Sequence, residues 1–282
     1  MNPVLDAVLL GVVEGLTEFL PISSTGHLIV AERLVGYRDT AATFTVVIQL
    51  GAILAVAWYY RADLVRRVVR LFAGDAAARA FWLNLVVATI PAAVLGLSLE
   101  KTIEAHLLTP LTVAVTLILG GAVLWWLEAR NARLPVSSAS EDLTAPDFSA
   151  ITPRQALVIG LAQTVALVPG VSRSGASIVG GTLTGLNRVT ATAFSFYLGL
   201  PVLGLAGLYK LYKVRGDLSS VPGGGLALGV GTLVSFVVAL LAVSWLLRYV
   251  ARHDLRGFAV YRAVAGLALL VLIAVGWLSG GA

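Results

Sequence analysis

The chain has 282 residues, of which 58% are hydrophobic and only 12% charged, and its mean hydropathy is +0.91. Such a small number of charged side chains cannot cover a water-soluble globule of this size. The composition therefore favours a membrane protein and excludes a disordered chain or a nucleic-acid-binding protein. The formal charge of +5 is then explained by arginines at membrane boundaries, and the absence of cysteine excludes disulfides and thiolate chemistry.

The first half of the chain, residues 1–130, begins with an apolar region that is broken in its middle. Residues 4–35 contain the sequence PISSTG at positions 21–26, and neither half of this region reaches the roughly 20 helical residues that cross a hydrocarbon core. Broken backbone at membrane depth must be satisfied by protein or water, so we predict a re-entrant helical hairpin. Three spanning helices are predicted to follow, at residues 42–60, 81–99 and 110–127.

The second half, residues 155–282, repeats this order after a polar linker rich in serine and proline at residues 131–154. Residues 155–186 are again apolar and broken, here by PGVSRSG at positions 169–175, and predict a second re-entrant hairpin. Three further spans are predicted at residues 190–209, 225–247 and 259–279.

The two hairpins resemble each other at a constant offset of 149 residues. Gly11 falls on Gly160, and Ser23 with Gly26 falls on Ser172 with Gly175. Because each half has three spans, an odd number, the second copy must enter from the opposite side of the membrane. The predicted fold is therefore an all-α integral membrane protein with an inverted-topology repeat, in which both hairpin tips meet near the bilayer midplane.

Arginine placement predicts the orientation of this bundle. Alternating spans place three arginine-rich segments on one side, which the positive-inside rule makes cytoplasmic, so both termini are expected outside. These arginines are Arg61, Arg66, Arg67, Arg70 and Arg79 in a loop after the first span, Arg130, Arg133 and Arg154 around the linker, and Arg248, Arg252 and Arg256 before the last span.

Two carboxylates at membrane depth suggest function in the first hairpin. Glu14 and Glu18 are four residues apart and share one helix face, so they could bind a divalent cation or share a proton. Two alternatives stay open: the pair is hydrated near an interface, or Glu18 is the ion-pair partner of Arg173.

Polar residues follow at the turn of the same hairpin. Ser23, Ser24, Thr25, Gly26 and His27 open a helix, whose N-terminal amides and dipole suit a phosphate group. A hydroxyl with an imidazole three residues later supplies a nucleophile and a base. The alternative is a serine that caps the helix and a histidine that bonds between helices.

The second hairpin adds Arg173, flanked by Ser172 and Ser174, with Ser177 one turn further. A guanidinium group at membrane depth needs an anionic partner, and its planar fork matches phosphate. It could instead pair with a glutamate and only lock the tips together. Acids, hydroxyls, a histidine and an arginine that converge favour phosphate-ester or pyrophosphate chemistry over such a lock.

These two motifs resemble those of the undecaprenyl-pyrophosphate phosphatases of bacteria, the bacitracin-resistance type. EGLTEFLPISSTGH at positions 14–27 is similar to the family's first motif and PGVSRSGAS at positions 169–177 to its second, with Ser177 where the family usually has threonine. The resemblance spans essentially the whole chain. It implies an enzyme of the bacterial plasma (inner) membrane that opens to the outer, periplasmic face, removes the terminal phosphate of undecaprenyl pyrophosphate and so recycles the lipid carrier of cell-wall synthesis.

The resemblance also implies roles for individual residues. Glu14 and Glu18 would handle protons or a divalent cation such as Mg²⁺ or Ca²⁺, and Ser24 is the favoured nucleophile. His27 would be the base or an alternative nucleophile, and Arg173 would clamp the pyrophosphate. The expected substrate-binding residues are Ser23, Thr25, Gly170, Ser172, Ser174 and Ser177. A homodimer is left open.

One rival function comes from another class. Inverted repeats with broken helices are transporter architecture, so a lipid-carrier flippase or secondary transporter would use the same symmetry. Phosphate release by the purified protein without any gradient separates the two classes, because a pure transporter releases none.

Overall fold

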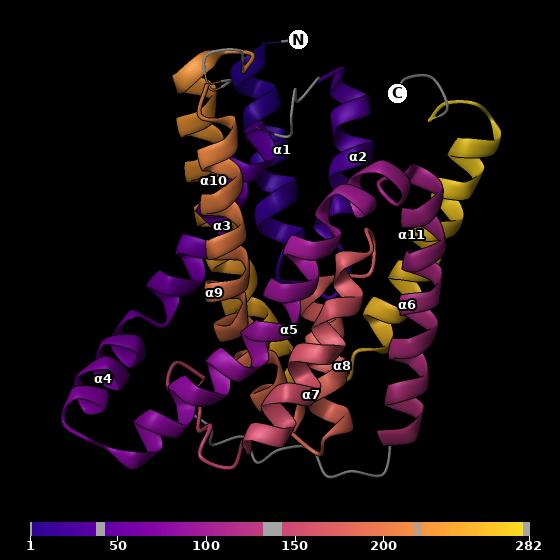
Figure 1. The fold of residues 1–282 in the computed structure, drawn as a ribbon. Helices are drawn as coiled ribbons and strands as arrows, with labels where there is room; N and C mark the ends of the chain where they lie inside the picture. The colour runs from indigo at the N-terminus through magenta and orange to yellow at the C-terminus, as the bar shows by residue number, and fades with distance from the viewer. Residues whose placement is uncertain (1, 38–42, 132–142, 217, 219–220, 279–282) are drawn as a thin grey trace.

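The structure is a computed structural model that describes residues 2–37, 43–131, 143–216, 218 and 221–278. Every regular element within these residues is a helix, which confirms the predicted all-α class (Figure 1). The predicted linker falls partly outside the description, which omits residues 132–142 and with them Arg133. The helices are α1 (Pro3–Thr17), α2 (Ser24–Val35), α3 (Thr43–Tyr59), α4 (Arg61–Phe72), α5 (Ala76–His106), α6 (Pro110–Asn131), α7 (Pro153–Thr164), α8 (Arg173–Leu183), α9 (Arg188–Val214), α10 (Gly224–Val250) and α11 (Arg256–Ala274).

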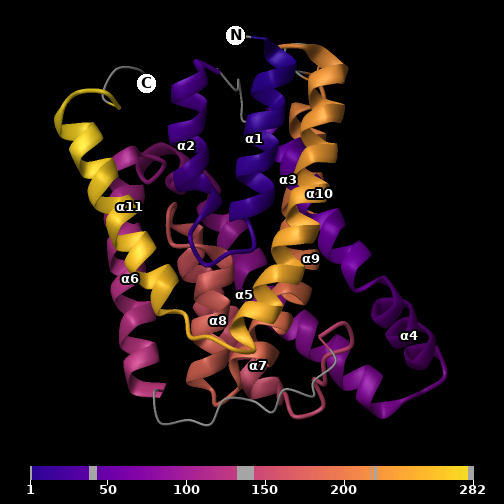
Figure 2. The ribbon, with the colours of Figure 1, turned by 180° about the vertical axis from the view of Figure 1, so that it is seen from behind.

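Both predicted breaks are present. α1 and α2 form one hairpin, and α7 and α8, joined through the short 3₁₀ helix η2 (Val165–Leu167), form the other. The four helices have 15, 12, 12 and 11 residues, so none of them alone crosses a hydrocarbon core of about 20 residues. α1 and α7 enter the bundle from opposite ends, and the two breaks lie in its interior (Figures 1 and 2). We call residues 18–23 tip 1 and residues 168–172 tip 2.

Five helices are long and apolar enough to cross a membrane: α5, α6, α9, α10 and α11. The remaining predicted span, residues 42–60, corresponds to α3. It meets α4 at a bend of 69°, and the two helices are long and apolar enough to cross a membrane only when they are taken together as one bent span. α5 and α9 extend beyond their predicted bounds and each contains a proline, Pro91 and Pro201. Membrane helices tolerate such residues because neighbouring groups satisfy the freed backbone.

The arginine-bearing segments gather at one end of the bundle. α4, the start of α7 and the α10–α11 connection lie at this end, whereas α1 begins and α11 ends at the other (Figures 1 and 2). Trp58, Trp125, Trp126 and Trp245, near the ends of helices that reach the same region, are each about half exposed. Tryptophan at this level is typical of a membrane–water boundary. We call this region the arginine-rich end.

One expectation from the sequence is wrong. Residues 61–72, expected to be a loop, form α4. Val65, Val68, Val69 and Phe72 recur at helical spacing and are exposed on one face. The helical spacing of these apolar residues, rather than the mean hydropathy of the segment, is therefore the sequence signal that indicates α4.

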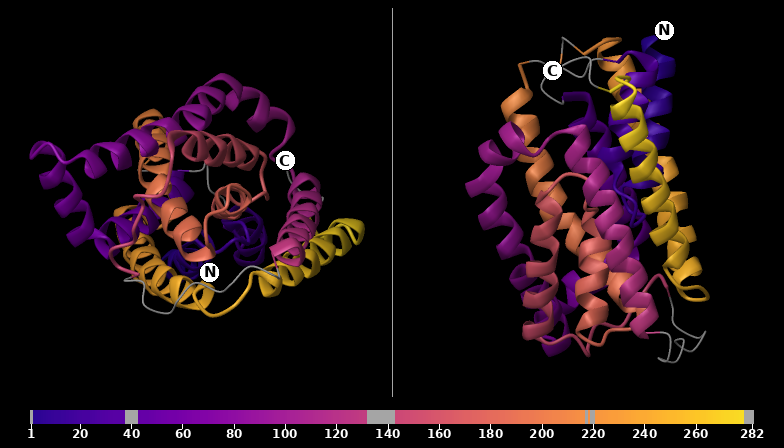
Figure 3. Two further views of the ribbon diagram at one scale, coloured as in Figure 1. Left: turned by 90° about the horizontal axis from the view of Figure 1, so that it is seen from below. Right: turned by 90° about the vertical axis from the view of Figure 1, so that its right-hand side faces the viewer.

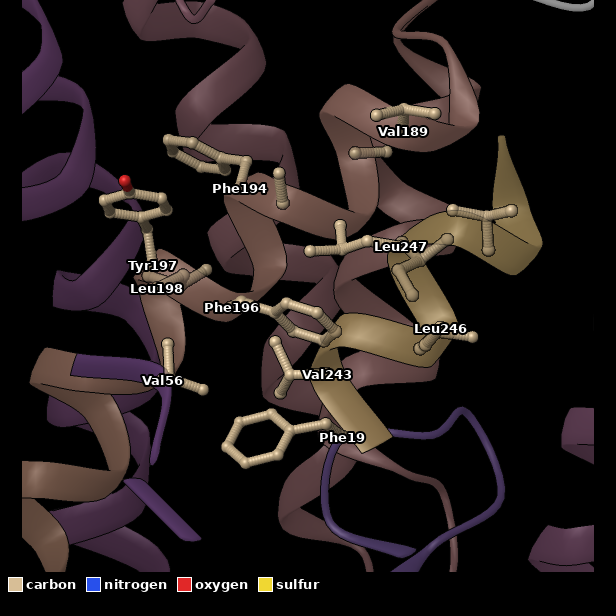
Figure 4. Packing of buried hydrophobic residues seen from close by; sticks show 14 of the residues in the cluster. Phe19, Val56, Val189, Phe194, Phe196, Tyr197, Leu198, Val243, Leu246 and Leu247 are labelled. Carbon is tan, nitrogen blue, oxygen red and sulfur yellow. The ribbon is translucent and has the colours of Figure 1, made fainter. Parts of the chain in front are cut away.

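Aromatic and aliphatic packing fixes tip 1 inside the bundle. Phe19 is 1% exposed, and its ring meets Phe196 of α9 edge to face at 5.3 Å (Figure 4). Val243 of α10 lies beside the pair (Figure 4). Such an aromatic pair contributes about 0.5–1.5 kcal/mol beyond the area that it buries. In the view from below, α8 lies inside the ring of surrounding helices (Figure 3), so both tips are held by protein.

Candidate active site

The first hairpin brings a carboxylate and a hydroxyl into direct contact. Glu18 caps the C-terminus of α1 and Ser24 opens α2, and the Ser24 hydroxyl donates to Oε2 of Glu18 at 2.6 Å. A charge-assisted O–H···O⁻ bond of this length is strong. Two of the predicted catalytic residues therefore form a pair, and Glu18 is 7% exposed.

The two tips share an uncommon backbone conformation. Ser23 and Ser172, each the N-cap of its helix, have φ values of 72° and 73°, and they are the non-glycine residues with positive φ in the described structure. A side chain in this region costs free energy and persists where the surrounding structure requires it. The Ser172 hydroxyl accepts a bond from the amide of Gly175, whereas Ser23 caps no amide of α2 with its side chain.

Tip 2 directs Arg173 at tip 1. Nε of Arg173 lies 3.7 Å from Oε1 of Glu18, and its guanidinium lies 5.5 Å from the Phe19 ring centre. Nη1 donates to the carbonyl of Ser195 at 2.8 Å. Nε and Nη2 are buried without a hydrogen-bond partner. Unused donors of a buried guanidinium fit an anionic ligand, because leaving them unpaired is costly.

Two further contacts join the tips. The Ser174 hydroxyl donates to the carbonyl of Leu20 at 3.0 Å. Arg262 of α11, which is 1% exposed, donates to the carbonyl of Pro21 in tip 1 at 3.0 Å and to that of Gly170 in tip 2 at 3.2 Å. Its remaining bonds reach the carbonyls of Thr116 and Leu117 in α6. The tips are therefore held at a fixed separation.

Several predicted substrate-binding residues have structural partners instead. Ser174 and Ser177 are both fully buried, and Ser177 donates to the carbonyl of Arg173 at 2.8 Å. Gly170 has a φ of +89°, and a Cβ there would collide with Thr116. Thr25 is partly exposed in the first turn of α2. Direct contact of these residues with substrate stays a prediction.

Both ring nitrogens of His27 are bonded to groups other than the Ser24 hydroxyl. Its Nδ1–H donates to the carbonyl of Ser23 at 2.7 Å, so Nε2 is the acceptor for the hydroxyl of Tyr261 at 2.6 Å. The two rings are also stacked, with centres 5.6 Å apart. Glu18 rather than His27 is therefore the group that accepts the hydrogen bond of the Ser24 hydroxyl.

Glu14 is the group that fits a cation. It is fully buried, and both of its carboxylate oxygens lack a hydrogen-bond partner. A buried carboxylate without a partner is strongly disfavoured, so a proton or a cation must balance it. The described residues contain no cluster of three or more acidic, histidine or cysteine side chains that could hold a metal. The donor set fits Mg²⁺, which is commonly held by one or two carboxylates with substrate phosphates and water.

Arg262 and Tyr261 contact the site although neither was predicted to. Both lie inside the predicted span 259–279, and an arginine within a span is itself a signal of function. Their partners could not be read from the sequence, because tip 1 lies more than two hundred residues earlier in the chain.

Comparison with known proteins identifies the family. The model of the bacitracin resistance protein BacA family matches residues 7–268, which include both tips and Arg262. The chain belongs to the BacA family. Relatives named undecaprenyl-diphosphatase occur in Dechloromonas aromatica, 46% identical over all of both chains, and in Burkholderia cenocepacia, 50% identical over 97% of this chain and 96% of the relative. A Burkholderia thailandensis relative with the same activity in its name is 49% identical over 96% of each chain. The resemblance of the two motifs to this family is thus confirmed.

Proposed function

We propose that this BacA-family protein is a membrane-bound undecaprenyl-diphosphatase, which hydrolyses undecaprenyl pyrophosphate to undecaprenyl phosphate and inorganic phosphate. The observation that carries the proposal is the contact of Ser24 with Glu18 and of Glu18 with Arg173 within a bundle of apolar helices. The names of its relatives support the same activity and favour it over transport alone.

The geometry supports Ser24 as nucleophile and Glu18 as general base. As Oγ of Ser24 bonds to the terminal phosphorus, its proton passes to Oε2 of Glu18, 2.6 Å away, and the bond from phosphorus to the bridging oxygen breaks. Undecaprenyl phosphate leaves with that oxygen. The oxygen of a water molecule then bonds to the phosphorus of the phosphoserine as the bond from phosphorus to Oγ breaks. Glu18 returns its proton to Oγ of Ser24, and the proton lost by the water leaves with inorganic phosphate or solvent.

Arg173 and the start of α2 would bind the diphosphate. Nε and Nη2 of Arg173 form no hydrogen bond within the described residues, although Nε lies 3.7 Å from Glu18, and both are suited to charge-assisted bonds with phosphate oxygens. The first amides of α2 are not capped by the Ser23 side chain, so they would donate to an oxygen of the terminal phosphate at the positive end of the helix dipole. Both groups neutralise charge where phosphoryl transfer requires it.

A divalent cation, Mg²⁺ in preference to Ca²⁺, would be held by Glu14 with Glu18. Both carboxylates face the same side of α1 and its C-terminal cap. When bound, the cation would neutralise phosphate charge. Glu14 would keep it in place while Glu18 exchanges a proton with Ser24.

We also propose that the halves form an inverted repeat whose site opens to the outer face. Support comes from the matching φ values of Ser23 and Ser172, 149 residues apart, and from the opposite entry of α1 and α7 (Figure 1). The positive-inside rule places the arginine-rich end in the cytoplasm and both termini outside.

The proposed activity is tested with purified protein in detergent, without any gradient. C55 diphosphate should give one inorganic phosphate for each C55 phosphate formed, and the rate should fall when a chelator is added and recover with Mg²⁺. If folded protein released no phosphate in the presence of Mg²⁺, the proposal would be contradicted, and lipid transport would be the favoured function.

A further inference from the structure

A second polar feature lies at the arginine-rich end, where α4 and the start of α5 project from the bundle (Figures 1 and 3). A cavity of about 230 Å³ separates the polar side of these helices from residues 145–149. None of its lining residues belongs to tip 1, tip 2 or α11. Six charged residues line it: Asp63, Arg66, Arg67, Arg70, Asp75 and Asp147.

The three aspartates of this α4 cavity are already bonded within the chain. Asp63 accepts from Arg66 at 2.8 Å and also from Arg67 and the Tyr197 hydroxyl. Asp75 caps α5 by accepting from the amide of Ala78. Asp147 accepts both the amide and the hydroxyl of Ser149. These carboxylates therefore have little capacity left for a ligand.

The arginines, by contrast, retain unused donors. The Arg70 guanidinium has no hydrogen-bond or ion-pair partner among the described residues. The Arg66 side chain is 48% exposed and uses only Nη2, which donates to Asp63. Arg66 and Arg70 are four residues apart and lie on the same face of α4. Two guanidinium groups in the lining of one cavity offer unused donors to an anion, and their planar forks match phosphate.

The opposite face of α4 shows where this site lies relative to the membrane. Val65, Val69 and Phe72 are 63%, 61% and 86% exposed, and Val68 belongs to the same stripe. Helices with an exposed apolar stripe and arginines on the other face lie in the plane of a membrane–water interface. Residues 61–79 carry five arginines and two aspartates, so this segment has a net positive charge, whereas the three arginines and three aspartates that line the cavity balance one another.

We propose that the α4 cavity binds the phosphate headgroup of an anionic phospholipid from the leaflet at the arginine-rich end. Arg70 and Arg66 donate to the phosphate, while Val65, Val69 and Phe72 on the opposite face of α4 pack against acyl chains of the same leaflet. This site is separate from the tips and does not depend on the diphosphatase activity. It ties α4 to one leaflet and so holds the bundle at a fixed depth.

The test uses the purified full-length protein and counts bound lipid by native mass spectrometry. Phosphatidylglycerol should be retained in preference to phosphatidylcholine. Arg70→Gln and the double variant Arg66→Gln/Arg70→Gln should weaken phosphatidylglycerol retention about 10-fold, because charge-assisted bonds to the phosphate are lost. Arg130→Gln, an exposed arginine on α6 at the same end, is the matched control and should retain the lipid.

Three outcomes would overturn the proposal. Equal retention by wild type and Arg70→Gln would exclude the site; Arg70 has no partner in the described chain, so its loss should leave the fold intact. Displacement of phosphatidylglycerol by farnesyl phosphate at lower concentration would identify a polyprenyl phosphate as the ligand. A change of oligomeric mass in Phe72→Asp would show that a second copy covers the stripe. Phosphate release in detergent should stay within about 2-fold of wild type in Arg70→Gln.

Discussion

The hydroxyl of Ser24 and the carboxylate of Glu18 are joined by a 2.6 Å hydrogen bond across the break between α1 and α2. The second oxygen of that carboxylate lies 3.7 Å from Nε of Arg173, which follows Ser24 by 149 residues in the chain. One carboxylate therefore links the proposed nucleophile to the proposed phosphate-binding cation, and each can be perturbed separately.

Glu18→Gln removes the proton acceptor but preserves the size of the side chain. Loss of a general base typically lowers kcat about 100- to 10,000-fold, and we expect a fall in this range with C55 diphosphate. The matched control is Glu100→Gln near the C-terminal end of α5. It removes a carboxylate that is paired with Lys213 of α9, and it should leave kcat near the wild-type value. Near-normal turnover by Glu18→Gln would show that another group accepts the Ser24 proton.

Gly199→Ala tests the position of Arg173 without changing it. A Cβ at Gly199 on α9 would lie 2.8 Å from Nη1 of Arg173, so the guanidinium must move while the backbone need not. Displacing one charge-stabilising group typically costs up to about 100- to 1,000-fold in rate, and we expect a loss of at least about 10-fold.

Gly204→Ala on the same helix is the control for that substitution, because a Cβ at Gly204 would have no neighbouring atom within 4 Å. Both variants should keep the wild-type Tm. Full activity in Gly199→Ala, measured as phosphate release, would mean that the position of Arg173 is not required.

Arg262→Gln should both destabilise the bundle and reduce activity. It leaves the buried carbonyls of Pro21 and Gly170 with fewer donors, and each unsatisfied group costs about 1–3 kcal/mol. We expect a lower Tm and a lower kcat in the same variant, since the tips lose their common support. Arg256→Gln, at the partly exposed start of α11, should change neither property. An unchanged Tm in Arg262→Gln would refute this role.

The proposed orientation in the membrane can be tested by labelling single introduced cysteines, because the chain contains no cysteine of its own. Asn2→Cys should react with an impermeant maleimide added outside intact spheroplasts. Asp254→Cys, in the α10–α11 connection at the arginine-rich end, should react only after lysis. The opposite pattern would reverse the assignment of the outer face.

The hairpins were predictable because Pro21, Gly26, Pro169 and Gly175 interrupt apolar sequence too early for a span. The pairing of Glu18 with Arg173 was predictable as one alternative, since a buried arginine needs an anion. In contrast, α4 was missed because hydropathy averages hide the helical spacing of its valines.

The partners of His27 and Arg262 could not be predicted. The stacking of Tyr261 on His27 depends on how α11 packs beside the start of α2, and no local pattern encodes that packing. The Arg262 side chain donates to backbone carbonyls. Because every residue has a backbone carbonyl, the sequence does not indicate which ones Arg262 contacts. The candidate reactive side chains could therefore be named from the sequence, but the residues that support them could not.

Whether the two tips act as one catalytic unit is tested most directly by a double-mutant cycle of kcat/KM. Ser24→Ala, Arg173→Ala and the double variant are compared with wild type on C55 diphosphate with Mg²⁺. Residues that act together show strongly non-additive losses, so the double variant should be within about 10-fold of the worse single variant. Fully additive losses would contradict a single unit, because Ser24 and Arg173 would then contribute independently.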